Sequence, residues 1–373
     1  MTAVSVTSII GTQPQAGLGD GLLKHFADYS EDQRTQFCAT SMRLCHKAMV
    51  AIVATSILAM LFAMVFFTLP KTLTGCMVPL VLSLYPENQF ALLFTKTRFD
   101  RQFQTRTLWA LFRAPLVCIC AIIGAIVSGA IGMAWGFMLG NTAAYIVVRL
   151  RYRVYYQSLY NPEMAAVLKN IWLQMTIAGT LMVAGPYINR VILAFYNSYG
   201  DVAELVAATS VMFLFLTPVS CSSIFLMSMI SKYTSISQFS YKARVAWFSI
   251  MFLGVFVLPG LLFLFGNHIM AVLFPKFGEG PSRLLHILIC VVAFQTLISL
   301  IRPFVIKFAS IKIIPIINGA SLAIILITAF LLIPSYGTVG AAWAIVVSNL
   351  ITALLWMLVI WRLYSRRPIE IKA

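Results

Sequence analysis

The chain has 373 residues, of which 61% are hydrophobic and only 10% are charged. Soluble domains carry about 25% charged residues and need a charged exterior, so this composition excludes a soluble enzyme and a disordered chain. The net charge is +16, from 27 Lys and Arg residues against 11 Asp and Glu residues. What remains is a protein with many membrane-spanning helices, whose positive charge has to be interpreted relative to the bilayer.

A membrane-spanning helix needs about 20 mostly apolar residues. The apolar stretches are continuous and do not alternate with polar residues, so they predict helices and not the strands of a barrel. The sequence therefore predicts an all-α polytopic membrane protein with about ten transmembrane helices. The predicted spans are 48–69, 73–95, 108–128, 131–150, 171–195, 203–229, 245–274, 284–305, 311–333 and 338–362.

Lysine and arginine residues indicate the orientation of these spans, because they are enriched in cytoplasmic loops. With a cytoplasmic N-terminus, 22 of the 27 basic residues lie in cytoplasmic segments and 3 lie in outer loops. The other two, Arg113 and Arg190, lie within predicted helices. This distribution places both termini in the cytoplasm. It also excludes nucleic acid as a partner, because the positive charge faces the anionic inner leaflet.

An internal repeat relates two parts of the chain. The run Gly129–Asn141 matches Gly337–Asn349 at an offset of 208 residues, and the same offset places Glu87 on Gln295. An even number of helices per repeat predicts two parallel, repeat-related bundles. About forty residues of the first repeat are missing relative to the second, so we interpret Thr2–Asp20 as the remnant of a helix.

The predicted organisation follows from this repeat. It consists of an N-terminal cytoplasmic segment with the remnant helix (1–41), an N-terminal bundle of four helices (42–153), a cytoplasmic linker (154–168), a C-terminal bundle of six helices (169–365) and a cytoplasmic tail (366–373). The polar residues within the bundles are the candidates for function, because polar side chains inside a membrane are costly and usually face a cavity or a partner.

Three stretches carry a resemblance to a known family. They are Gly17-Leu-Gly-Asp-Gly-Leu-Leu-Lys-His-Phe-Ala-Asp28, Pro186-Tyr-Ile-Asn-Arg190 and Gly337-Thr-Val-Gly-Ala-Ala-Trp-Ala344. With its two parallel halves, the chain resembles the Wzx-type lipid-linked oligosaccharide flippases. These belong to the multidrug/oligosaccharidyl-lipid/polysaccharide (MOP) exporter superfamily, whose fold is MATE-like. Relative to that family the chain lacks about one and a half N-terminal helices.

The resemblance implies a function and a set of partners. Such a flippase moves a polyprenyl-pyrophosphate-linked oligosaccharide from the inner to the outer leaflet of the bacterial cytoplasmic membrane by alternating access, for O-antigen or exopolysaccharide biosynthesis. It uses a cationic cavity between its halves. The implied partners are the lipid-linked oligosaccharide, membrane lipids, and the polysaccharide polymerase and export machinery. We expect no cofactor, no metal and no enzymatic activity, since the four histidines are scattered and no glycine-rich phosphate loop is present.

Arg190 is the first candidate for substrate binding. It lies about five residues, roughly 7.5 Å, inside the outer end of its predicted helix. A charge within the bilayer costs from about 2.5 kcal/mol upwards. The functional interpretation is a cation that binds the substrate's pyrophosphate, helped by Asn189. The structural interpretation is an arginine that reaches back to the outer interface.

The remaining candidates have both a functional and a structural interpretation. Arg113 lies near the cytoplasmic face, where it either reaches the headgroups or meets an incoming lipid. Glu87, with Asn88 beside it and Gln295 as its repeat mate, is either a protonatable coupling site or a partner for an arginine. Two further residues, Asn141 and Asn349, are either interhelical contacts or parts of the pathway.

Two other functions stay open. A cation-coupled drug exporter of the same fold predicts an acidic site deep in one bundle and a cavity that is not net positive. A truncated, non-transporting membrane component is the alternative suggested by the missing residues. The presence of one intramembrane acid against two arginines favours the flippase.

Overall fold

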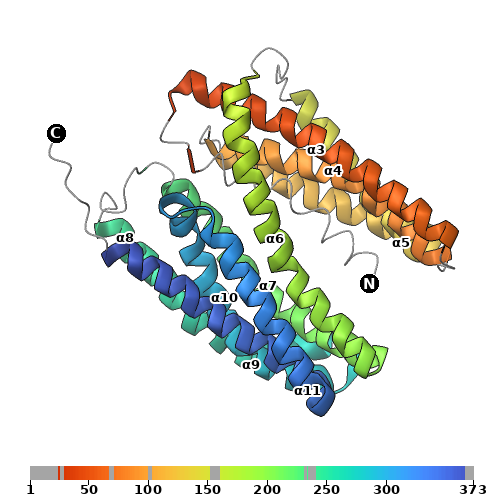
Figure 1. Ribbon diagram of the computed structural model, residues 1–373. Helices are drawn as coiled ribbons and strands as arrows, with labels where there is room; N and C mark the ends of the chain where they lie inside the picture. Colours follow the sequence, from red (N-terminus) through yellow and green to blue (C-terminus); the bar gives the residue numbers. More distant parts are fainter. Residues whose placement is uncertain are drawn as a thin grey trace. The chain divides into compact units, whose positions relative to one another are not determined.

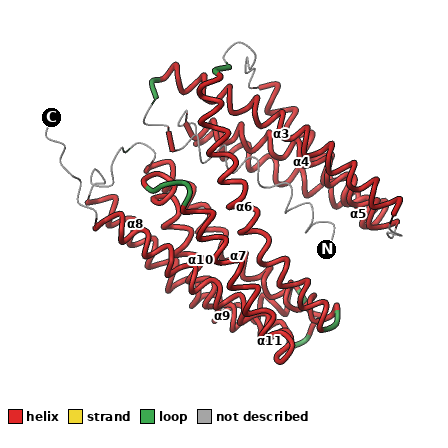
Figure 2. The backbone as a smooth tube through the Cα atoms, viewed as in Figure 1, coloured by secondary structure: helices red, strands yellow, loops and turns green. Residues whose placement is uncertain are grey.

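The computed structural model describes residues 24–25, 29–66, 71–99, 103–151, 160–230, 233 and 241–365. Across these residues the chain consists of helices and short turns, without strands (Figure 2). Seven helical stretches are long and apolar enough to cross a membrane, so the chain is a multi-pass membrane protein. The predicted remnant helix Thr2–Asp20, most of the Gly17–Asp28 motif, part of the predicted linker and the tail 366–373 lie outside the described residues.

The seven stretches overlap nine of the ten predicted spans, because the longest two each cover two of them. They are Asp32–Phe62, Leu108–Arg151, Pro162–Tyr196, Tyr199–Met227, Arg244–Leu273, Gly280–Phe308 and Ile313–Leu363. The predicted span 73–95 is helical, as α4 (Lys71–Phe99), but it is not among the seven. Two boundaries also differ: α3 (Glu31–Phe66) and α6 (Pro162–Tyr196) begin earlier than predicted. Their early turns are kept helical by tertiary packing, since Phe37 and Met164 are buried in one core.

The described helices form two compact units, Met1–Thr180 (unit 1) and Leu181–Ala373 (unit 2), with the division inside α6. In unit 1, α4 packs against both α3 and α5 (Phe103–Arg151), as Figure 1 shows. Side chains of α3, α4, α5 and the start of α6 form its core. The buried members include Met42, Met49, Leu84, Leu92, Ala144, Val148 and Leu168.

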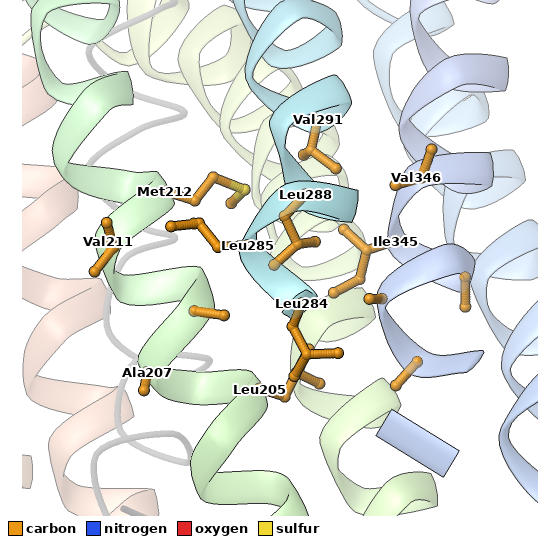
Figure 3. Close-up of a cluster of buried hydrophobic side chains, with 14 of the residues drawn as sticks. Leu205, Ala207, Val211, Met212, Leu284, Leu285, Leu288, Val291, Ile345 and Val346 are labelled. Atoms are coloured by element: carbon orange, nitrogen blue, oxygen red, sulfur yellow. The ribbon is translucent and has the colours of Figure 1, made fainter. Parts of the chain in front are cut away.

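Unit 2 is organised around α10 (Gly280–Phe308), which packs against α7, α9 and α11. Its other elements are α7 (Tyr199–Ile230), α8 (Tyr241–Phe252), the π-helical turn η3 (Leu253–Val257), α9 (Leu258–Leu273), the short η4 (Pro275–Phe277) and α11 (Ile313–Ser365). Figure 3 shows Leu285 and Leu288 of α10 between Met212 of α7 and Ile345 of α11. These aliphatic side chains interdigitate and exclude solvent from the centre of the unit.

Both α5 and α11 are hairpins of two antiparallel helices. Each contains one glycine at positive φ, Gly129 (φ 60°) in α5 and Gly337 (φ 53°) in α11, a conformation that a residue with a side chain rarely adopts. A Cβ added to Gly136 would meet the backbone of Cys120. In one straight helix those two residues would be about 24 Å apart, so the chain must reverse between them. The two turns separate the predicted pairs of spans, and they lie 208 residues apart, the offset of the sequence repeat.

Candidate functional site

A charged polar cluster lies within unit 1, on the facing sides of α4 and the two arms of α5. Its first member, Glu87, follows Pro86 in the middle of α4. Proline lacks a backbone N–H and crowds the preceding turn, so α4 is perturbed where its polar residues lie. The next residue, Asn88, is buried and donates from Nδ2 to the carbonyl of Leu84 at 2.8 Å.

Arg113, on the first arm of α5, connects the members of this cluster. Its Nη2 is 3.2 Å from Glu87 Oε1, which makes a salt bridge. Its Nε and Nη2 both donate to Asn141 Oδ1 on the second arm, at 3.0 and 2.8 Å. The guanidinium also stacks over the ring of Phe90, 4.8 Å from its centroid. We call Glu87, Arg113 and Asn141 the charged node.

The charged node is only partly enclosed. The side chains of Arg113 and Glu87 keep 24% and 37% of their accessible surface, whereas Asn141 is buried. Asn141 is held by its own helix, because its Nδ2 donates to the Phe137 carbonyl at 3.1 Å. The node therefore has a fixed amide and a partly open ion pair. An arginine in such a position could exchange its carboxylate for another anion without leaving the amide.

Unit 2 contains the neutral counterpart of this node at the repeat offset. Gln295, the mate of Glu87, donates from Nε2 directly to Oδ1 of Asn349, the mate of Asn141. Asn349 is again held by its own helix, through an Nδ2 donation to the Ile345 carbonyl at 2.8 Å. The residue equivalent to Arg113 is Ser321, which bonds to Ser348 instead (Oγ to Oγ, 3.1 Å). The equivalent positions therefore carry a charged cluster bridged by an arginine in unit 1, and neutral polar pairs with different contacts in unit 2.

Two other predicted site residues, Arg190 and Asn189, lie outside the charged node, in the part of α6 that belongs to unit 2. Arg190 is half-buried, lies about 9 Å before the end of α6 at Tyr196, and donates from Nη2 to Thr209 Oγ1 at 3.4 Å. Its guanidinium lies 5.4 Å from the centroid of the Tyr187 ring. Among the described residues it has no carboxylate within ion-pair distance.

Asn189 points to a different neighbour. It is 1% exposed, and its Nδ2 donates to the Ala341 carbonyl of α11 at 3.1 Å. Its Oδ1 is buried and accepts no hydrogen bond from the described residues. This residue holds α6 against α11, four residues after the turn at Gly337.

The structure thus brings together three of the predicted site residues in unit 1 and two, Gln295 with Asn349, in unit 2. Sequence reasoning did not identify Phe90 and Thr209 as contacts, since nothing in their local pattern marks them. Ser321 was identifiable, because the 208-residue offset that pairs Glu87 with Gln295 also pairs Arg113 with Ser321.

Comparison of the sequence with known family models and with curated proteins finds no match. Comparison of the structure with solved structures does. A multidrug resistance transporter of the MATE family, in an outward-facing conformation, matches with a TM-score of 0.75 and 12% identity, over 97% of this chain and 85% of that chain. A MOP superfamily transporter from Pyrococcus furiosus matches with a TM-score of 0.77 and 11% identity, over 97% and 85%.

The lipid II flippase MurJ, in an inward closed conformation, matches with a TM-score of 0.61 and 17% identity, over 95% of this chain and 78% of that chain. At sequence identities this low, the substrate of one protein cannot be assigned to another. They show that the chain has the fold of the MOP superfamily transporters.

Proposed function

We propose that this chain is a flippase that moves a polyprenyl-pyrophosphate-linked oligosaccharide from the inner to the outer leaflet of a bacterial cytoplasmic membrane, for O-antigen or exopolysaccharide synthesis. The fold supports a transporter, and a lipid II flippase is among the proteins that share it. A fold alone does not select the substrate, which has to be argued from the site.

The observation that carries the proposal is the excess of positive charge within the described helices. Glu87, an acidic side chain near the middle of α4, is already paired with Arg113. Arg190 has a hydroxyl and an aromatic ring as neighbours, and no carboxylate within ion-pair distance in the part of the chain that the structure describes. An arginine kept in a membrane helix without a counter-ion is costly unless an anion binds to it. A pyrophosphate headgroup is such an anion and matches the planar guanidinium.

In the proposed cycle the lipid tail stays in the bilayer while Arg190 binds the pyrophosphate. Alternating access then exposes the headgroup to the outer side, where the polymerase and export machinery would receive the oligosaccharide. Resetting the carrier needs an energy source. The membrane potential supplies about 2.3 kcal/mol per elementary charge per 100 mV.

A cation-coupled drug exporter is the second candidate, because the TM-score is higher for the multidrug MATE transporter (0.75) than for the lipid II flippase (0.61). That function needs a carboxylate that gains and loses a cation. Glu87 could serve only if Arg113 released it, since the two are bonded at 3.2 Å. The two functions differ in which residue is indispensable: Arg190 for the flippase and Glu87 for the exporter.

The test is complementation of a bacterial strain that lacks its own oligosaccharide flippase, with surface glycan as the measured product. We expect Arg190→Ala to reduce export at least tenfold and Arg190→Lys to retain part of it, because lysine keeps the charge but loses the bidentate geometry. Lys169→Ala is the matched control, since Lys169 is an exposed basic residue on the same helix.

Membrane levels of each variant are measured by immunoblot, so that a loss of protein is distinguished from a loss of function. Full glycan export by Arg190→Ala would contradict the proposed phosphate contact. Loss of drug resistance in Glu87→Gln, with glycan export absent in the wild type, would favour the exporter.

A further inference from the structure

An apolar groove in unit 1 is separate from the charged node. It is a cavity of about 750 Å³ between α3, α4 and the second arm of α5. Its walls include Val50 and Ile57 of α3, Leu82 and Pro86 of α4, and Met138 and Ile146 of α5. A cavity of this size lined by such residues suits a hydrocarbon chain and not a sugar or an ion.

The groove continues into a smaller, more polar cavity of about 520 Å³, which shares Tyr145 and Ile146 with it and is also lined by Arg149. The Arg149 guanidinium lies 5.8 Å from the centroid of the Tyr145 ring, and its Nη1 is 3.3 Å from the Tyr145 hydroxyl. Tyr85, a residue of the groove wall, stands edge-on to Tyr145 and bonds to His46 Nδ1 at 2.8 Å. One end of the groove is therefore polar and cationic.

The length of the groove corresponds to one leaflet of a membrane. From Met138 to Leu150, along the second arm of α5, the two cavities extend over about 18 Å. The hydrocarbon core of one leaflet is about 15 Å deep. Arg149 and Arg151 lie in the last turn of that arm, at the end that the distribution of basic residues predicts to be cytoplasmic. The cationic end thus lies where anionic headgroups are found.

We propose that this groove binds an anionic glycerophospholipid of the bilayer, with one acyl chain along α3 and α5 and the phosphodiester at Arg149. A single arginine with two tyrosine hydroxyls nearby matches a headgroup with one negative charge. The site is built from unit 1 alone and does not depend on the substrate that the protein transports. Its role is to hold a resident lipid between α3 and the α5 hairpin.

The experiment is native mass spectrometry of the full chain released from detergent. The protein is incubated with phosphatidylglycerol or phosphatidylcholine of identical acyl chains. We expect phosphatidylglycerol to be retained preferentially, and Arg149→Gln to weaken its retention about tenfold, as expected for the loss of a hydrogen-bonded charge. Arg151→Gln is the matched control, because Arg151 is in the same helical turn but lines neither cavity.

Ala54→Phe tests the apolar part of the site, since Ala54 lines the groove and a phenyl ring would fill it. It should reduce the retention of both lipids, while inorganic phosphate at millimolar concentration should not displace phosphatidylglycerol. Equal retention of the two lipids, or equal retention by Arg149→Gln and the wild type, would overturn the proposal. Preferential retention of a polyprenyl phosphate over phosphatidylglycerol would also overturn it.

Discussion

At the scale of single residues, the charged node of unit 1 can be compared with the neutral residues at the equivalent positions of unit 2. Arg113 satisfies a carboxylate and an amide at once, whereas in unit 2 Gln295 reaches Asn349 directly and Ser321 stands where the arginine would be. The neutral arrangement shows that this position can be satisfied without charge. We therefore expect the charge in unit 1 to be replaceable as far as packing is concerned, because neutral residues occupy the equivalent positions in unit 2.

This comparison predicts the behaviour of three variants. Arg113→Ser alone leaves Glu87 without its partner in a half-buried site, and we expect it to cost about 1–2 kcal/mol. In a chain of 373 residues a change of that size lowers Tm by about 1–3 °C. The double variant Glu87→Gln/Arg113→Ser reproduces the residues of unit 2 and should recover most of that loss.

The measurement is thermal unfolding in one detergent, followed by an intrinsic tryptophan signal, with Glu87→Gln as the third variant of a double-mutant cycle. If the decrease in Tm of the double variant equalled the sum of the decreases in the two single variants, the positions in unit 1 and unit 2 would not be equivalent. A double variant that kept its Tm but lost glycan export would show that the charge serves function.

The sequence indicated the members of the node and gave an arginine as one possible partner of Glu87, but it did not indicate which contacts form. Glu87, Arg113 and Asn141 each stand out as polar residues in apolar stretches, and the repeat relates two of them to Gln295 and Asn349. Whether Arg113 turns outward to headgroups or inward to Glu87 depends on the packing of α4 against the α5 hairpin. The periodicity of a helix shows on which face of the helix a residue lies, but not which neighbouring helix that face contacts, so it cannot specify the packing.

At the scale of elements, the α5 hairpin depends on glycines where its two arms meet. A Cβ on Gly132 or Gly136 would be placed against the backbone of the opposite arm. Small residues at such positions let helix backbones approach closely within a membrane. The predicted spans end and begin on either side of Gly129 (128 and 131) and Gly337 (333 and 338), but the sequence analysis did not identify these glycines as the turns. It did not predict the π-helical turn Leu253–Val257, since the extra residue leaves the apolar pattern of that span unbroken.

We therefore expect Gly132→Ala and Gly136→Ala to separate the arms and destabilise the protein by about 1–3 kcal/mol, the usual cost of overpacking. Gly260→Ala is the matched control: Gly260 is helical and exposed, and a Cβ there meets nothing within 4 Å. It should be neutral or slightly stabilising, because alanine is the better helix former. Thermal unfolding of the three purified variants measures this, and equal Tm values would contradict the close-packed hairpin.

At the scale of the whole molecule, composition was enough to predict a helical membrane protein, and the 208-residue repeat indicated two related halves before any coordinates. The fold agrees with that of MOP transporters at 11–17% identity. Such a fold is specified by hydrophobic spans, turns and small residues, which many sequences can supply. The substrate depends on a few polar side chains, so composition and fold leave it open.

The orientation in the membrane is the last prediction, and it can be tested at the two ends of α10. This helix has 29 residues and is therefore about 43 Å long, close to the thickness of a bilayer with its headgroups. Glu279, just before it, and Lys312, just after it, are both exposed. Because basic residues concentrate on the cytoplasmic side, we expect Glu279 outside and Lys312 inside.

Single cysteines at these positions, Glu279→Cys and Lys312→Cys, are introduced into a chain whose seven native cysteines have been replaced. A membrane-impermeant maleimide applied to intact spheroplasts should label the first variant, and should label the second only after permeabilisation. The reverse pattern would invert the topology and place Arg149 at the outer leaflet. Labelling of both in intact spheroplasts would mean that α10 does not cross the membrane, because a spanning helix of this length must separate its two ends.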